Sequence, residues 1–319
     1  MFGRRLINTS SVSSAESGPD ISSYSYNALL SDTTGVETGP SHHGYFFIGD
    51  SGTKLYIATT NYDNHSDDRY PLSTPYAPSS RGGRDQSVSR NPPNHYNSSL
   101  FFKPDGTKYY MMGYSNGYSA GSNSIVQATM STPWDLNTAT IYNGTRPGGF
   151  IGHHANSITF SEDGGTWYSL STVNASNSNG DNTILRQISL STSWDFSSTH
   201  TIVNTVDLKT IVPEWISGNY LSGGTGWTDG NFFVHAGGVN AYMTIQYYSG
   251  STYQSSKTYR FTMSTPFDIT TLSADSSVLI PGSVFNNVGA AYHGNTMIMD
   301  DGKMIIAAKG GNYKFLVFN

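Results

Sequence analysis

The sequence has no cysteine, which excludes disulfide bonds, thiolate metal sites and a cysteine nucleophile. It also has little charge: Asp, Glu, Lys and Arg are 12% of its 319 residues, and the net charge is −5. The longest basic run is Arg4-Arg5, so we expect no nucleic-acid partner. No run reaches the ~18 apolar residues of a membrane span, and the polar N-terminus lacks the hydrophobic stretch of a signal peptide. We therefore expect neither membrane insertion nor export by an N-terminal signal.

Residues that favour turns and strands are abundant in the sequence. Gly (34) and Tyr (22) are abundant, with a visible excess of Ser, Thr and Asn. The strong helix formers Ala, Glu, Lys and Leu are comparatively few. This composition predicts an all-β protein.

A six-residue pattern recurs along the chain, as STPWDL at residues 131–136, STSWDF at 191–196 and STPFDI at 264–269. Before each copy come two β-rich runs joined by a turn, which indicate a hairpin, and then a third β-rich run. The turn glycines Gly106 and Gly164 are 58 residues apart, close to the 60 residues between Ser131 and Ser191. With a fourth run after the turn, each unit is predicted to be a four-stranded antiparallel sheet.

Five such units occur, near residues 44–90, 98–145, 156–208, 230–281 and 295–319. Repeated four-stranded units without intervening helices are typical of a β-propeller. Residues 21–319 are therefore predicted to form a five-bladed β-propeller, with six or seven blades as the alternative. The last unit stops after three strand signals. We expect the N-terminal segment 21–30, with strand residues 23–27, to supply its fourth strand, because closing the ring removes two exposed sheet edges.

The recurring hexapeptide is predicted to be the turn between the third and fourth strands of a blade. Pro133 suits a turn, because proline cannot donate a hydrogen bond within a ladder. We expect each aromatic residue to pack between neighbouring blades, and the aspartate after it to bond nearby backbone amides. These residues are Trp134, Trp194 and Phe267, followed by Asp135, Asp195 and Asp268. We interpret the repeat as structural rather than ligand-binding.

The second and third units share a pattern of a Phe-x-x-Asp-Gly-x-Lys hairpin followed by a Ser-Thr-Pro-Trp-Asp turn. The matching residues are Phe102, Asp105, Gly106, Lys108 and 131–135 in the second unit, and Phe160, Asp163, Gly164, Trp194 and Asp195 in the third. This pattern resembles a repeat common in virion proteins of marine bacteriophages, of the cyanophage and pelagiphage kind. The resemblance covers roughly residues 44–319, although the other three units are eroded. It implies a propeller module in a phage particle or its tail apparatus.

Catalysis has a specific requirement in five-bladed propellers. Those that hydrolyse glycosides use paired acidic residues facing one another. The chain has four glutamates, Glu16, Glu37, Glu162 and Glu214, and most of its aspartates are expected in turns. Glu214 and Asp229 are the remaining candidates, and nothing distinguishes them. We therefore predict that the chain is not an enzyme, and we assign it no catalytic residue, no cofactor and no resident metal.

Six histidines precede predicted hairpins. They are His42, His43, His95, His153, His154 and His293. In a propeller this position lies where the chain passes into an innermost strand, so we expect them around one mouth of the central channel. A ring of imidazoles there can hold a metal or an anion. The alternative is that repeat units place the same residue at the same packing position.

Two other sets of residues are candidates for contacts with other molecules. The loops 61–99 and 213–230 carry aromatics among small polar residues, a combination that binds sugars or proteins; the alternative is that they only pack over the propeller ends. Their candidate contact residues are Trp215, Tyr220 and Trp227. Residues 1–20 form a polar arm that is expected to become ordered across a neighbouring subunit. Its candidate contact residues are Phe2, Arg4, Arg5 and Leu6.

The sequence therefore predicts a non-enzymatic structural protein of a bacteriophage virion, in the tail, a fibre or the capsid surface, assembled in the host cytoplasm. We expect the arm to anchor multiple copies to other virion proteins in a symmetric assembly, and the propeller to contact host surface polysaccharide. Two alternatives stay open. One is a propeller-type carbohydrate-active enzyme, and the other is an intracellular protein-interaction scaffold.

Overall fold

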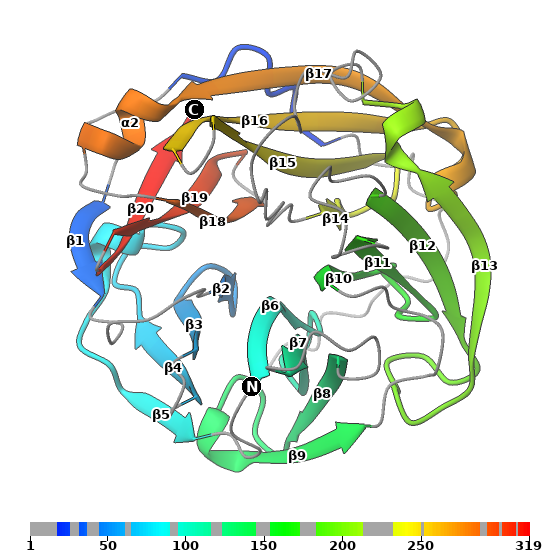
Figure 1. Ribbon diagram of the computed structural model, residues 1–319. Coiled ribbons are helices and arrows are strands. Elements are labelled where there is room, and N and C mark those ends of the chain that lie inside the picture. Colours follow the sequence, from blue (N-terminus) through cyan, green and yellow to red (C-terminus); the bar gives the residue numbers. More distant parts are fainter. Residues whose placement is uncertain are drawn as a thin grey trace, which may run out of the picture.

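The computed structural model of the chain describes residues 18–25, 32–36, 45–60, 65–89, 95–115, 123–144, 154–172, 183–212, 232–249, 252–287, 292–299, 302–310 and 312–319. These residues form five four-stranded antiparallel sheets arranged in a ring (Figure 1). The predicted five-bladed β-propeller is therefore confirmed. No helix in the described ranges has the length and apolar character needed to cross a membrane.

The blades are numbered here in chain order. Blade 1 contains β2 (Tyr45–Gly49), β3 (Lys54–Thr60), β4 (His65–Pro71) and β5 (Gln86–Ser89). Blade 2 contains β6 (His95–Phe102), β7 (Lys108–Ser115), β8 (Asn123–Met130) and β9 (Ala139–Gly144). Blade 3 contains β10 (His154–Phe160), β11 (Thr166–Thr172), β12 (Thr183–Leu190) and β13 (His200–Asp207). Blade 4 contains β14 (Phe232–Val234), β15 (Asn240–Ser249), β16 (Thr252–Met263) and β17 (Leu272–Pro281).

Blade 5 is built from both ends of the chain. It contains β18 (Tyr292–Ile298), β19 (Met304–Gly310) and β20 (Asn312–Phe318), with β1 (Asp32–Val36) as its fourth strand. The helical pieces are short: η1 (Pro78–Ser80), η2 (Leu136–Thr138), η3 (Leu208–Thr210), η4 (Ile269–Thr271) and α2 (Gly282–Asn287). An N-terminal strand therefore closes the ring, as predicted.

The closing strand is not the predicted segment 23–27. β1 pairs with β20 in antiparallel register, with Asp32 opposite Phe315 and Val36 opposite Tyr313. The earlier segment is a turn at this point, because the Tyr24 amide bonds the Ile21 carbonyl at 3.1 Å. The Ser25 amide bonds the carbonyl of Asn319, the residue after β20, at 3.1 Å. The alternating Ser and Tyr residues indicated a strand, whereas the chain turns there and pairs later.

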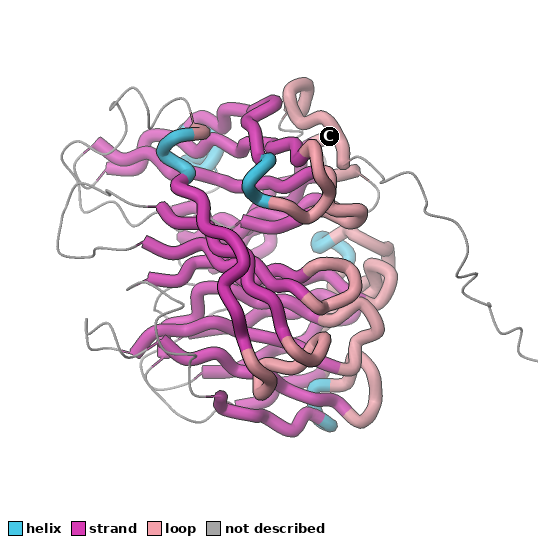
Figure 2. Tube along the Cα trace, turned by 90° about the vertical axis from the view of Figure 1, so that its right-hand side faces the viewer, coloured by secondary structure: helices cyan, strands magenta, loops and turns pink. Residues whose placement is uncertain are grey.

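The propeller has two different faces (Figure 2). The described hairpin turns between first and second strands, and the turns between third and fourth strands, lie together on one face, called here the turn face. The chain passes into the innermost strands from the opposite face, called here the loop face. The innermost strands β2, β6, β10, β14 and β18 surround the axis (Figure 1), so their first residues lie around it on the loop face.

Aromatic residues with a left-handed backbone conformation form the turns between third and fourth strands. The backbone φ angles of Trp134, Trp194 and Phe267 are 64°, 62° and 65°, a region that residues other than glycine rarely adopt. Each ring covers the glycine of its own blade's hairpin; a Cβ on Gly106 would overlap the Trp134 ring. The same rings contact the preceding blade, as where Trp134 lies 6.1 Å from Tyr56 between ring centroids. Packing between neighbouring blades is therefore confirmed.

The aspartate after each aromatic residue caps the next turn of the backbone, which is a short 3₁₀ helix after Asp135 and Asp268. The carboxylates of Asp135, Asp195 and Asp268 accept hydrogen bonds from backbone amides two residues later, at 2.9 to 3.0 Å. This is the bond expected from the sequence. It holds the turn in place before the fourth strand begins.

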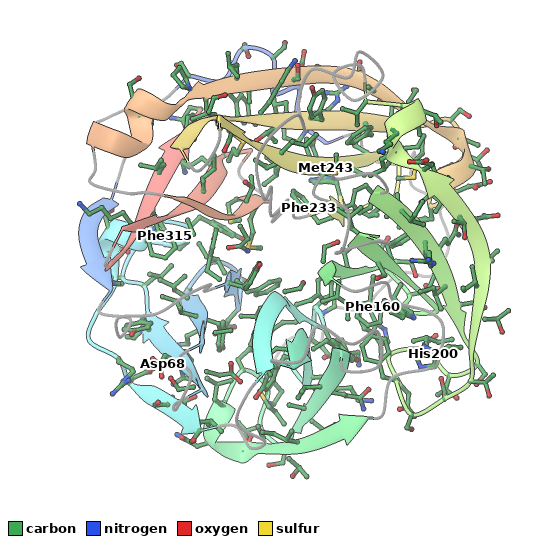
Figure 3. The ribbon with its side chains drawn as sticks, in the orientation of Figure 1. Asp68, Phe160, His200, Phe233, Met243 and Phe315 are labelled. Atoms are coloured by element: carbon green, nitrogen blue, oxygen red, sulfur yellow. The ribbon has the colours of Figure 1, made fainter. Side chains whose placement is uncertain are left out.

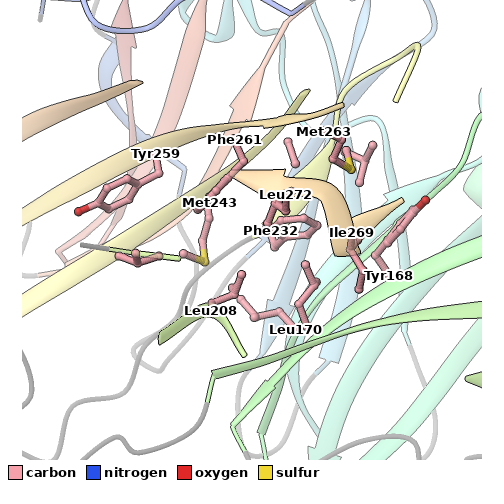
Figure 4. Packing of buried hydrophobic residues seen from close by; sticks show 14 of the residues in the cluster. Tyr168, Leu170, Leu208, Phe232, Met243, Tyr259, Phe261, Met263, Ile269 and Leu272 are labelled. Atoms are coloured by element: carbon pink, nitrogen blue, oxygen red, sulfur yellow. The ribbon is translucent and has the colours of Figure 1, made fainter. Parts of the chain in front are cut away.

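Five clusters of buried apolar residues form the core, one at each junction between consecutive blades. Figure 4 shows the cluster between blades 3 and 4, where Tyr168 and Leu170 meet Phe232 and Met243. At the junction of blades 5 and 1, Phe315 packs edge-on against Phe46 with ring centroids 5.2 Å apart (Figure 3 labels Phe315). Burying one such side chain stabilises the fold by about 1.5–3 kcal/mol, so the blades hold one another in place.

Candidate functional site

The loop face is the candidate binding site, because three of the predicted histidines lie at or next to the start of an innermost strand there. His95 and His154 are the first residues of β6 and β10, and His293 is the second residue of β18. Their backbones therefore lie near the axis at the same end of the propeller (Figure 1). The structure describes these backbones but not the imidazole rings. His42, His43 and His153 lie outside the described residues, so a ligand role for all six stays a prediction.

The other predicted contact residues also lie outside the described part of the chain. They are the loop aromatics Trp215, Tyr220 and Trp227, the arm residues Phe2, Arg4, Arg5 and Leu6, and the carboxylates Glu214 and Asp229. Their place in the connectivity is nevertheless fixed. The segment with the loop aromatics joins Val212 to Phe232, which is the first residue of the innermost strand β14.

Neutral polar side chains join the innermost strands of neighbouring blades. The Ser99 hydroxyl accepts a hydrogen bond from the Ile158 amide at 2.8 Å. Asn295 bonds both backbone groups of Phe46, accepting from its amide at 3.1 Å and donating to its carbonyl at 2.9 Å. Both side chains are buried, so these bonds are protected from water. They fix the spacing of the strands that carry the histidines.

The threonines of blades 4 and 5 form a similar contact. Thr244 on β15 bonds Thr258 on β16 at 2.9 Å and Thr296 on β18 at 2.8 Å. All three side chains are buried. Sequence analysis did not single out these residues, because isolated Ser, Thr and Asn residues are common throughout this chain.

Two buried carboxylates occur in the described residues, Asp67 and Asp68 on β4. Asp67 accepts a hydrogen bond from the Tyr109 hydroxyl at 3.0 Å, across the junction with blade 2. Asp68, labelled in Figure 3, accepts one from Ser87 at 2.6 Å and pairs with Arg84 at 3.3 Å. Adjacent residues of a strand point to opposite faces, so the two carboxylates do not form a facing pair. β4 is also a third strand, away from the axis.

The axis itself is lined by strands without carboxylates. Within the bounds given above, the five innermost strands contain neither Asp nor Glu. Across the described ranges, no group of three or more His, Asp or Glu side chains is placed to hold a metal ion. The described innermost strands therefore supply no carboxylate to the axis, and Glu214 and Asp229 belong to the connection before β14, outside the described residues.

Sequence analysis missed four tyrosines on the second strands of blades 1 to 4. The hydroxyls of these junction tyrosines reach the next turn in the ring, at the carbonyls of Trp134, Trp194, Phe267 and Pro19. They are Tyr56, Tyr110, Tyr168 and Tyr242, and burial raises the pKa of each phenol well above its usual value. Each stands four residues after a turn glycine, so the sequence did contain the signal.

Comparison with known proteins finds only distant structural likenesses. No protein-family model and no curated sequence matches the chain. An exo-β-1,3-galactanase from Phanerochaete chrysosporium superposes with a TM-score of 0.49 at 13% identity, covering 90% of this chain and 63% of that one. An engineered GH43 glycoside hydrolase gives 0.47 at 12% identity, with 92% and 51% covered. An aldose sugar dehydrogenase from Streptomyces coelicolor gives 0.42 at 13% identity, with 89% and 82% covered.

These likenesses are distant, and this chain spans less than two thirds of the two hydrolases. The prediction that the chain is not an enzyme is nevertheless wrong on this comparison, because the architecture is one that glycoside hydrolases and other carbohydrate-active enzymes use. The prediction depended on finding no recognisable pair of acids in the sequence. In a propeller, paired acids can come from different blades, so their spacing along the chain is not diagnostic.

Proposed function

We propose that this chain is a structural component of a bacteriophage particle whose loop face contacts host surface polysaccharide. The observation that carries the proposal is the convergence of connections on one face. The connection with Trp215, Tyr220 and Trp227 leads into β14, and His95, His154 and His293 begin or nearly begin their own innermost strands. Aromatic side chains among small polar residues provide stiff contact area for sugar rings.

The assignment to a phage particle is supported by the repeat. The Phe-x-x-Asp-Gly-x-Lys hairpin and the Ser-Thr-Pro-Trp-Asp turn of blade 2 resemble those of marine phage virion proteins. In this proposal residues 1–17 anchor the propeller to another virion protein. Gly18 is the residue at which that arm meets the propeller, because its amide bonds the Asn240 side chain at 2.8 Å.

Binding to intact cells tests the contact with the host. Labelled full-length protein is added to marine cyanobacterial and heterotrophic cells, and to their purified surface polysaccharide. We expect saturable binding, and a loss of about tenfold or more when Trp215, Tyr220 and Trp227 are all replaced by alanine, since one stacking contact contributes roughly 0.5–1.5 kcal/mol. Leu279→Ala is the control, because this exposed residue lies on the outermost strand β17. Equal loss in both variants, or no binding to any cell, would refute the role of the loop face.

A truncation tests the role of the arm. The deletion should remove residues 1–17 and keep Gly18, Pro19 and Asp20, because Gly18 and Pro19 are hydrogen-bonded to blade 4. We expect the truncated protein to bind cells as the full chain does but to fail to join the particle. Incorporation of the truncated protein into particles at the normal level would rule out an anchoring arm.

A carbohydrate-active enzyme is the second candidate function. The observation in its favour is that Glu214 and Asp229 occur in the same connection as the three loop aromatics, and glycoside hydrolysis requires two carboxylates. The same polysaccharide is incubated with the protein and assayed for new reducing ends. Release that is abolished by Glu214→Gln or Asp229→Asn would identify an enzyme, whereas binding without release would favour attachment.

A further inference from the structure

The fifth blade lacks the turn that the other four blades have between their third and fourth strands. β20 ends at Phe318, and its neighbour β1 begins at Asp32 near the other end of the chain. Residues 18–24, called here the N-terminal turn segment, lie on blades 4 and 5 instead. Ile21 is fully buried in the cluster between those blades, so the segment is part of the core.

The N-terminal turn segment has the internal bonds of the repeated turn. Its sequence Pro-Asp-Ile-Ser-Ser at 19–23 parallels Phe-Asp-Ile-Thr-Thr at 267–271. Asp20 accepts a hydrogen bond from the Ser22 amide at 3.0 Å, as Asp268 does from the Thr270 amide at 2.9 Å. The Tyr24 amide bonds the Ile21 carbonyl, as the Leu272 amide bonds Ile269.

The propeller binds this segment with the same groups that it uses for the other turns. The Tyr242 hydroxyl donates to the Pro19 carbonyl at 2.8 Å, and the equivalent Tyr168 hydroxyl donates to the Phe267 carbonyl at 2.7 Å. Arg260, which pairs across the sheet with Tyr242, donates to the Gly18 carbonyl at 3.4 Å. In blade 1, Arg69 takes this position and donates to the Trp134 carbonyl.

The segment differs from the other described turns in its bond to the hairpin glycine. In the other turns the aromatic residue's amide donates to the hairpin glycine, as Phe267 does to Gly238 at 2.8 Å. Proline has no amide hydrogen, and the Tyr24 hydroxyl donates to the Gly302 carbonyl instead.

Gly18, the first residue of the segment, also makes close contacts with blade 4. Asn240 is buried, and its side-chain oxygen accepts a hydrogen bond from the Gly18 amide at 2.8 Å, while its amide nitrogen donates to the Phe261 carbonyl at 3.2 Å. A Cβ on Gly18 would overlap the Tyr242 hydroxyl. The first position of the segment therefore requires glycine.

We propose that blades 4 and 5 form a peptide-binding site specific for a Gly-Pro-Asp-Ile turn, which the chain fills reversibly with its own residues 18–24. The other turns are joined to strands of their own blade at both ends. The N-terminal turn segment is covalently joined to blade 5 only through the connection to β1. Its binding to the site is therefore an intramolecular equilibrium between a bound and a released segment. The inference does not depend on the attachment role proposed above.

Competition with a free peptide tests the site in the full-length protein. The probe is a fluorescent peptide of residues 16–25, ESGPDISSYS. In the wild-type protein the tethered segment has an effective concentration of about a millimolar and excludes the peptide. The double variant Asp20→Ala/Ile21→Ala weakens the tethered segment and leaves the site intact. We expect the peptide to bind this variant at least about tenfold more tightly than wild type.

Two controls define specificity. A peptide with alanine at the Asp20 and Ile21 positions should not bind the variant, and adding Tyr242→Phe to the variant should weaken the wild-type peptide severalfold. Equal binding to wild type and variant, equal binding of both peptides, or no binding to a correctly folded variant would overturn the proposal.

Hydrogen exchange on the wild-type protein tests whether the segment leaves its site, even if the variant does not fold. The amides of Gly18, Ser22, Tyr24 and Ser25 each donate a hydrogen bond. We expect them to exchange more slowly than in a free peptide but faster than the matched amides of Thr270 and Leu272, whose turn is joined at both ends. Exchange at the free-peptide rate, or protection equal to that of the matched amides, would contradict a reversible site.

Discussion

The Tyr168 hydroxyl lies 2.7 Å from the carbonyl oxygen of Phe267 and donates a hydrogen bond from blade 3 into the turn of blade 4. The other junction tyrosines make the same bond at three further junctions. The junction between blades 5 and 1 differs, because Ile305 and its cross-strand neighbour Val317 take the equivalent positions. Four junctions therefore have a hydrogen bond from a tyrosine hydroxyl to a turn carbonyl, and the junction between blades 5 and 1 has apolar side chains in its place.

Removing the Tyr168 hydroxyl should destabilise the propeller measurably. Tyr168→Phe keeps the ring but leaves the Phe267 carbonyl without this donor, so we expect a loss of about 1–2 kcal/mol in the free energy of unfolding. Tyr110→Phe is the matched control, since Lys108 also donates to the Trp194 carbonyl, at 2.9 Å, and we expect a smaller loss there. Urea unfolding of both variants measures the difference, and equal losses would contradict this account.

Gly164 should not tolerate alanine, because its φ is +68° and a Cβ there would overlap the Trp194 ring. We expect Gly164→Ala to cost about 2–4 kcal/mol, from the left-handed backbone and from overpacking. Gly302→Ala separates the two effects, since Gly302 has a φ of +84° with no atom within 4 Å of its Cβ position. This control should cost only about 1–2 kcal/mol. Thermal unfolding of both proteins gives the comparison.

Asn295 should be the most important polar side chain at the apolar junction. Asn295→Ala leaves both backbone groups of Phe46 unpaired in the interior, so we expect a loss of about 2–5 kcal/mol. Ser99 occupies the same position in β6, three residues before the strand ends; it accepts from the Ile158 amide at 2.8 Å and donates to the Ile158 carbonyl at only 3.5 Å. Ser99→Ala should therefore cost less. Hydrogen exchange of β2 and β18 should rise in Asn295→Ala specifically, and a uniform change throughout the protein would contradict a local role.

The sequence predicted the blades because their signals repeat at nearly constant spacing. Gly106 and Gly164 take positive φ at the hairpins, and Trp134 and Trp194 do so at the turns, so the same residues recur wherever the backbone needs them. The closing strand was misplaced because segment 23–27 has strand periodicity, while pairing with a distant strand depends on contacts that local periodicity does not report.

The junction contacts were harder to predict than the blades. Tyr242 and Tyr168 could be aligned from their spacing to the turn glycines, but their acceptors are backbone carbonyls, which no residue type marks. The match between segment 19–23 and segment 267–271 was visible in the sequence. It was missed because Pro19 replaces the aromatic residue that defined the repeat, and because the segment lies at the other end of the chain from its blade.

Alkaline pH should unfold the propeller through the junction tyrosines. Burial raises the pKa of Tyr56, Tyr110, Tyr168 and Tyr242 in the folded protein, whereas in the unfolded chain a tyrosine titrates near 10. Below pH ~10 both states keep the proton and the full stability is present. Above it the unfolded state loses protons that the folded state retains, so stability falls as pH rises, by up to about 1.4 kcal/mol per pH unit for each tyrosine.

Urea unfolding at a series of pH values from about 9 to 12 measures this slope. Tyr168→Phe is the internal control, because it removes one titrating group and should make the decline shallower by one tyrosine's share. Tyr70, whose pKa burial raises to about 12, contributes to the remaining slope in both proteins. A free energy of unfolding that stays constant through this range, or an identical slope in Tyr168→Phe, would show that the junction tyrosines do not govern the alkaline limit of the fold.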